Sequence, residues 1–89
     1  MPKDFLLRQN YPNPFNPVTK IEFALSKASY VKLSVYNILG EEIQVLVNES
    51  LNAGKYEVIY NALKLPSGVY FYRISADGFS ETRKMVLIK

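Results

Sequence analysis

Apolar and polar residues alternate along most of the chain, and a helical period is hard to find. The segment 21–25 carries Ile, Phe and Leu at every second position, and the segment 31–35 carries Val, Leu and Val in the same way. Because successive side chains of a strand point to opposite faces, each segment predicts a half-buried strand with one solvated face. The pattern therefore predicts an all-β protein.

Turn residues divide the rest of the chain into further strands. In addition to the two above, we expect strands at residues 5–8, 42–47, 55–60, 69–76 and 79–88. The run 37–40 predicts a turn, and Asp77-Gly78 predicts a tight hairpin between the last two strands. Residues 48–54 and 61–68 read as polar connections. Seven strands at this spacing predict an immunoglobulin-like antiparallel β-sandwich.

A tyrosine just after a turn, at the start of the penultimate strand, resembles the tyrosine corner of immunoglobulin-like domains. Gly68, Val69 and Tyr70 form this candidate structural corner. In such a corner the ring turns inward and the hydroxyl bonds to the backbone upstream. Tyr72 and Ile74 would then share the inward face with Tyr70. The run 85–88 has no alternation, so its inward face stays open.

Seven tyrosines could form a stacking platform for sugars or peptides, but packing in the core is the alternative that the strand pattern favours. Buried rings are expected for Tyr56, Tyr60, Tyr70 and Tyr72. More exposed rings are expected for Tyr30, Tyr36 and Phe71.

Three prolines and two asparagines in seven residues predict a rigid, extended loop near the N-terminus. The loop consists of Tyr11, Pro12, Asn13, Pro14, Phe15, Asn16 and Pro17. Proline fixes φ, lacks an N–H and restricts the residue before it. We therefore expect the loop to be extended but not to pair with a strand of either sheet. It could bridge the two sheets, plug one end with its two aromatic rings and block strand addition. It could also be a preorganised recognition surface. Alanine at both asparagines would separate these hypotheses, because melting falls only if their side chains satisfy buried backbone.

Composition excludes several functions. The chain of 89 residues reads as one domain, residues 1–89, and has neither cysteine nor histidine, which removes disulfides, thiolate sites and the commonest general base. The net charge of +3 comes from scattered basic residues, which does not indicate a nucleic-acid partner. No apolar run is long enough to span a bilayer, and the first residues do not resemble a secretory signal.

No arrangement of reactive side chains stands out. Glu41 and Glu42 are paired carboxylates in sequence, but neighbours on a strand point to opposite faces and cannot converge on one bond. Neither a phosphate-binding loop nor a metal-binding cluster occurs. We expect a non-catalytic protein without a catalytic residue, a metal site or a cofactor.

Several motifs together resemble one family over nearly the whole chain. They are the proline loop and the segments VYNILGEEI at 35–43, LNAG at 51–54, SGVYFYRI at 67–74 and TRKM at 82–85. This set resembles the type A C-terminal sorting domains of the type IX, or Por, secretion system. The resemblance implies an immunoglobulin-like sandwich at the C-terminus of a larger secreted protein. It implies a sorting signal that directs an N-terminal cargo domain across the outer membrane.

The resemblance also implies partners and recognition elements. The partners would be the outer-membrane secretion machinery and its surface protease, with the protein periplasmic in transit and then at the cell surface or extracellular. The recognition elements would be the proline loop, the Gly68 to Tyr70 corner and a terminal strand. That strand comprises Lys84, Met85, Val86, Leu87, Ile88 and Lys89, and serves either as core or as an edge that pairs with a partner's sheet.

Two other functions remain open from the sequence. One is a carbohydrate-binding or adhesive module, favoured by the tyrosines. The other is a structural spacer similar to the immunoglobulin-like domain of flagellar hook-capping proteins, which share a Pro-Asn-Pro-Phe loop.

Overall fold

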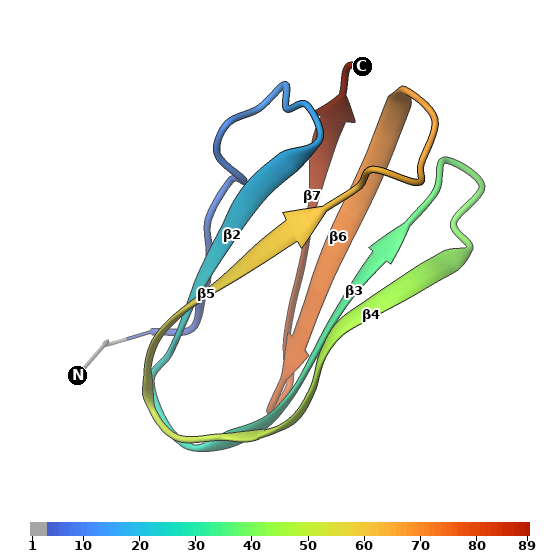
Figure 1. Ribbon diagram of the computed structural model, residues 1–89. Coiled ribbons are helices and arrows are strands. Elements are labelled where there is room, and N and C mark those ends of the chain that lie inside the picture. The colour runs from blue at the N-terminus through green and yellow to red at the C-terminus, as the bar shows by residue number, and fades with distance from the viewer. Residues whose placement is uncertain (1–3) are drawn as a thin grey trace.

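Seven strands build the protein, as the alternation predicts. The computed structural model describes residues 4–89, and the first three positions of the expected domain lie outside this range. The strands are β1 (Leu6–Leu7), β2 (Val18–Leu25), β3 (Ser29–Tyr36), β4 (Glu42–Leu51), β5 (Gly54–Asn61), β6 (Gly68–Ala76) and β7 (Phe79–Leu87) (Figure 1). None of the elements in this range is a helix long and apolar enough to cross a membrane.

The strands form two sheets that pack as a β-sandwich, which confirms the predicted fold class. One sheet has the order β1-β2-β5 and the other the order β4-β3-β6-β7. All strand pairs are antiparallel. The fourth strand pairs with β3, whereas in constant-type immunoglobulin domains the fourth strand joins the sheet of the fifth. The connection from β4 to β5 therefore passes from one sheet to the other.

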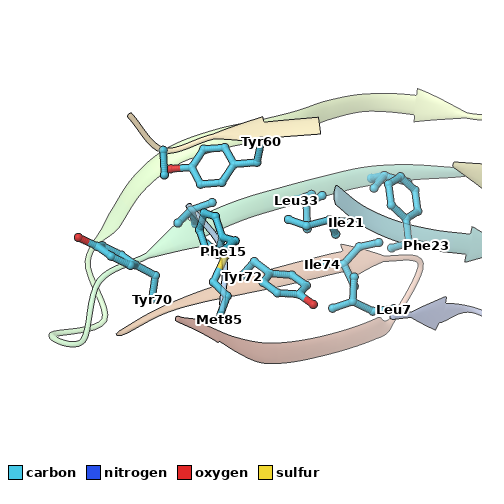
Figure 2. Packing of buried hydrophobic residues seen from close by; sticks show 14 of the residues in the cluster. Leu7, Phe15, Ile21, Phe23, Leu33, Tyr60, Tyr70, Tyr72, Ile74 and Met85 are labelled. Carbon is cyan, nitrogen blue, oxygen red and sulfur yellow. The ribbon is translucent and has the colours of Figure 1, made fainter. Parts of the chain in front are cut away.

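The core lies between the sheets and follows the predicted alternation. In β3 the buried apolar residues fall at every second position, and in β2 they do so except for Ala24, which is buried as well. In β6 Tyr70, Tyr72 and Ile74 face inward as expected. Figure 2 shows these rings with aliphatic side chains from both sheets. Met85 and Leu87 are buried, which defines the inward face of β7 that the sequence leaves open.

The tyrosine rings divide nearly as predicted. Tyr60 is buried, like the two tyrosines of β6, and Tyr30 is exposed. The Tyr56 ring is half-buried and stacks on Phe23, with 5.3 Å between ring centroids. Tyr36 and Phe71 are half-buried and line the outer face of the four-stranded sheet. A platform built from the buried tyrosines is excluded by this arrangement.

The last hairpin has the predicted tight turn. Asp77 and Gly78 have φ of 45° and 82°, and Ala76 pairs with Phe79 directly across the turn. Positive φ at both central residues is typical of a type I′ turn, whose backbone twist matches that of the two flanking strands.

One predicted connection is wrong. Residues 48–51 continue β4 and pair with β3 as far as Leu51, which lies opposite Ser29. Polar side chains are compatible with an edge strand because its backbone forms the ladder while the side chains face solvent. The first strand is shorter than predicted, since β1 contains only Leu6 and Leu7, although the Arg8 N–H still donates to the Glu22 carbonyl of β2 at 2.9 Å.

The two ends of the sandwich carry different segments. The proline loop, residue 89, the β3–β4 turn and the β5–β6 connection lie at one end, which we call the proline-loop end (Figure 1). Residue 4 and the turns β2–β3, β4–β5 and β6–β7 lie toward the other end. The longest extent of the molecule is 37 Å.

Candidate functional site: the proline loop and the terminal strand

The proline loop joins both sheets, so the expectation that it joins no ladder is wrong. Tyr11 pairs with Lys20 of β2 through two backbone hydrogen bonds of 2.9 and 3.0 Å. Phe15 forms a parallel bridge to β7, donating to the Val86 carbonyl and accepting from the Ile88 N–H, both at 2.9 Å. Only the prolines lack an N–H, and the residues between them keep both backbone groups. The loop thus bridges the sheets, as one of the two alternatives predicts.

The two aromatic rings of the loop have opposite environments. Phe15 is 2% exposed and lies among Tyr60, Tyr72 and Met85 in the core (Figure 2). Tyr11 is 75% exposed. The prediction that both rings plug the sandwich is therefore correct for Phe15 and wrong for Tyr11, whose ring is accessible to a partner.

The two asparagines of the loop also differ. The Asn13 Oδ1 accepts a hydrogen bond of 2.9 Å from the Val86 N–H, so this side chain satisfies the backbone of β7. Asn16 is exposed, and its side chain makes no hydrogen bond within the described part of the chain. Of the two, Asn16 has the side chain that is free to contact another molecule.

A buried polar cluster fixes the segment that leads into the loop. Asn10 and Thr19 are almost fully buried; the Asn10 Nδ2 donates to the Thr19 Oγ1 at 3.0 Å, and both side chains donate to the Pro12 carbonyl. The Tyr72 hydroxyl donates to the Arg8 carbonyl at 2.6 Å and accepts from the Asn10 N–H at 2.7 Å. Burial raises the pKa of Tyr72 to about 12, against the lowering effect of the Asn10 backbone.

The pattern of apolar and polar residues does not predict this buried polar cluster. One signal for it is present, because Thr19 is in phase with the inward residues Ile21, Phe23 and Leu25. A polar residue at an inward position needs a hydrogen-bond partner. No comparable signal points to Asn10, which lies outside the strands.

The predicted corner has the expected hydrogen bond, and the structure contains a second corner of the same form. The Tyr70 hydroxyl donates to the Pro66 carbonyl at 2.7 Å, and the Tyr56 hydroxyl donates to the Asn52 carbonyl at 2.6 Å. Each tyrosine follows a glycine two positions earlier, Gly54 or Gly68, with φ of 151° and 158°. Such φ values are rarely adopted by residues with a side chain. The shared Gly-x-Tyr spacing was the sequence signal for the second corner.

The terminal strand contributes to the core with one face and has its backbone edge covered. Val86 is half-buried, while Lys84, Ile88 and Lys89 are exposed. The free edge of β7 is met by residues 9–15, which we call the edge strap. The Gln9 Nε2 donates to the Lys84 carbonyl at 2.7 Å, and the bonds from Asn13 and Phe15 follow at positions 86 and 88. A partner's sheet cannot pair with this edge while the edge strap is in place.

The end of the chain is tied to the neighbouring β5–β6 connection. The Lys89 N–H donates to the Ser67 Oγ at 3.0 Å, and the Lys89 Nζ donates to the Leu63 carbonyl. The proline loop, the corner and the terminal strand therefore meet at the proline-loop end, as parts of one hydrogen-bonded surface.

No group of three or more acidic residues in the described range is placed to hold a metal ion. The fold and the site define a small β-sandwich module that offers shaped surfaces to other molecules. The chain matches the family model of the secretion system C-terminal sorting domain over residues 9–89, and it belongs to this family. No curated protein and no solved structure matches the chain.

Family membership gives the function at the level of the class. The protein is a non-catalytic sorting domain of the type IX secretion system, a secretion signal for cargo proteins. Such a domain is fused to cargo that is secreted or carried to the cell surface, and it interacts with the secretion machinery.

Proposed function

We propose that the secretion machinery recognises this domain at its proline-loop end, through the exposed side chains of Tyr11, Asn16, Ile88 and Lys89. The observation that supports this proposal is the joining of the loop to the terminal strand by the bonds of Asn13 and Phe15. A preorganised surface loses little conformational entropy when a partner binds. The recognised feature is then a composite of two chain segments, and it depends on correct folding.

Cargo joins on the side of residue 4, away from the surface that is recognised. Leu6 pairs with Ala24 next to the β2–β3 turn, so residue 4 lies toward the end opposite the proline loop. The domain passes through the periplasm, engages the outer-membrane machinery, and is removed by a surface protease after the cargo has crossed. The cargo then stays at the cell surface or is released.

Export of a reporter fused ahead of residue 4, in a host with the machinery, tests the recognition surface. We expect the double variant Tyr11→Ala with Asn16→Ala to leave several-fold more reporter in the periplasm. Its melting temperature should stay within about 4 °C of the wild-type value, because neither side chain is buried or structurally bonded.

Tyr30→Ala is the matched control, since this exposed tyrosine lies on β3 away from the loop. Its side chain bonds to exposed Asn48, so its loss should change export little. Normal export of the double variant, or an equal defect in Tyr30→Ala, would contradict recognition at the proline-loop end.

A further inference from the structure

The outer face of the four-stranded sheet carries a hollow of about 290 Å³ that the proposed recognition surface does not use. Its side chains include three apolar ones, Tyr36, Ile38 and Phe71, and three polar ones, Asn37, Arg73 and Thr82. We call it the aromatic groove. Tyr36 and Phe71 are cross-strand neighbours on β3 and β6, so their rings form a shared floor.

A stiff turn supplies one wall of the aromatic groove. The Asn37 Oδ1 accepts bonds of 3.0 Å from the N–H groups of Leu39 and Glu41, and the Asn37 Nδ2 donates to the Glu41 carboxylate at 2.8 Å. Ile38 lies in this turn and is 71% exposed. An exposed apolar side chain contributes little to the stability of the fold. Because the turn already holds it in place, it can contact a partner with little loss of conformational entropy.

Two cations without a carboxylate partner border the same groove. Arg73 lies two positions from Phe71 on β6, and Lys84 is the cross-strand neighbour of Phe71 on β7. The ion pairs found among residues 4–89 involve neither of them. The Arg73 Nε donates to the Ser80 Oγ at 3.0 Å, which orients the guanidinium group. The Glu41 carboxylate belongs to the turn, where Asn37 bonds it, so it is the β6–β7 side of the groove that complements a negative charge.

We propose that the aromatic groove binds an extended segment of a protein partner, which places an aromatic side chain on Tyr36 and Phe71 and a carboxylate against Arg73 and Lys84. Aromatic residues and arginine are enriched at the centres of protein interfaces, and carboxylate recognition by guanidinium is directional. The aromatic groove shares the β3–β4 turn with the proline-loop end but none of the four side chains of the proposed recognition surface, and the peptide titration tests it separately from export.

Titration of the 89-residue chain with two short peptides, followed by amide NMR shifts, tests the proposal. The acidic probe is acetyl-Glu-Phe-Glu-amide and the neutral probe is acetyl-Gln-Phe-Gln-amide. We expect the acidic probe to bind with millimolar affinity and to shift the amides of Tyr36, Ile38, Phe71 and Arg73. The neutral probe should bind about five-fold more weakly, a difference of about 1 kcal/mol.

Arg73→Gln and Lys84→Gln should each weaken the acidic probe by a similar factor, and both are exposed positions where the fold tolerates change. The matched control is Lys55→Gln, which removes an exposed cation from β5 of the other sheet and should leave binding unchanged. Equal affinity of the two probes, no effect of Arg73→Gln, or absence of any shift would overturn the proposal. So would a neutral oligosaccharide such as cellohexaose that shifts these amides when the peptides do not.

Discussion

Single polar side chains hold the leading segment of this protein against its core. The Tyr72 hydroxyl forms hydrogen bonds with two backbone groups at once. The side chains of Asn10 and Thr19 both donate to the Pro12 carbonyl. Removing one member of such a cluster leaves buried groups unsatisfied, which costs about 1–3 kcal/mol. The attachment of the leading segment thus depends on a few side chains that the apolar pattern does not reveal.

The Tyr72 hydroxyl should make stability depend on alkaline pH. Its pKa is raised to about 12 in the fold from an ordinary 10.0, so unfolding releases a proton between these pH values. The contribution is fully present below pH 10 and is lost as pH rises through 12. Urea unfolding across this window should show a steeper fall of the unfolding free energy for the wild type than for Tyr72→Phe. The variant should also be less stable at pH 7, and parallel curves would contradict the assignment.

The sequence predicts the apolar part of the interior because alternation reports directly which face of a strand is buried. It predicts Tyr70 and its hydrogen bond because the corner is a local motif. The cluster around Asn10 could not be predicted in the same way, since its bonds join residues as far apart as 10 and 72. Only the folded topology brings these groups together.

At the scale of elements, the edge strap and β7 form one unit. Prolines led us to expect a loop outside the ladders, yet each non-proline position that faces β7 still pairs with it. The edge strap also protects an otherwise open edge of the sheet, which is a common need of β proteins. Sequence patterns also fail for β4, because they do not show which backbone groups are available for pairing. The polar second half of β4 is a strand because its backbone pairs with β3.

Asn13→Ala should open this edge at one position. The Val86 N–H loses its acceptor, so its hydrogen exchange should speed up by about five-fold or more, with a loss of about 1 kcal/mol in local stability. The Ile88 N–H, bonded to the Phe15 carbonyl, should stay protected. Asn16→Ala is the control and should change neither amide. Unchanged exchange of Val86 in the first variant would show that the side chain does not hold the strap.

For the whole molecule, the important feature is the separation of its two ends. Of the segments that resemble the family's motifs, those at 11–17, 35–43 and 67–74 contribute to the proline-loop end (Figure 1). The motif at 51–54 forms the β4–β5 turn at the other end, and Leu6 pairs with Ala24 close to the β2–β3 turn of that end, so residue 4 lies toward it. No sequence pattern shows this grouping, because it depends on how the strands are ordered in the two sheets. It is the basis for placing recognition and cargo at opposite ends.

A folded tag therefore should affect export differently at the two ends. A small globular protein added after Lys89 covers the proline-loop end and should reduce export several-fold. The same protein inserted between the cargo and residue 4 should leave export unchanged. The measurement is the fraction of cargo at the surface or in the medium, with domain folding checked by circular dichroism. Equal export of the two fusions would contradict this arrangement.

The bridge between Phe15 and β7 also has a consequence for the order of synthesis. The Val86 and Ile88 groups that bind the backbone of Phe15 emerge from the ribosome about 70 residues after it. The buried side chains of Met85 and Leu87 arrive equally late. A nascent chain that lacks these residues lacks part of its core and the partners of Phe15, so we expect the domain to fold only after translation has passed residue 88.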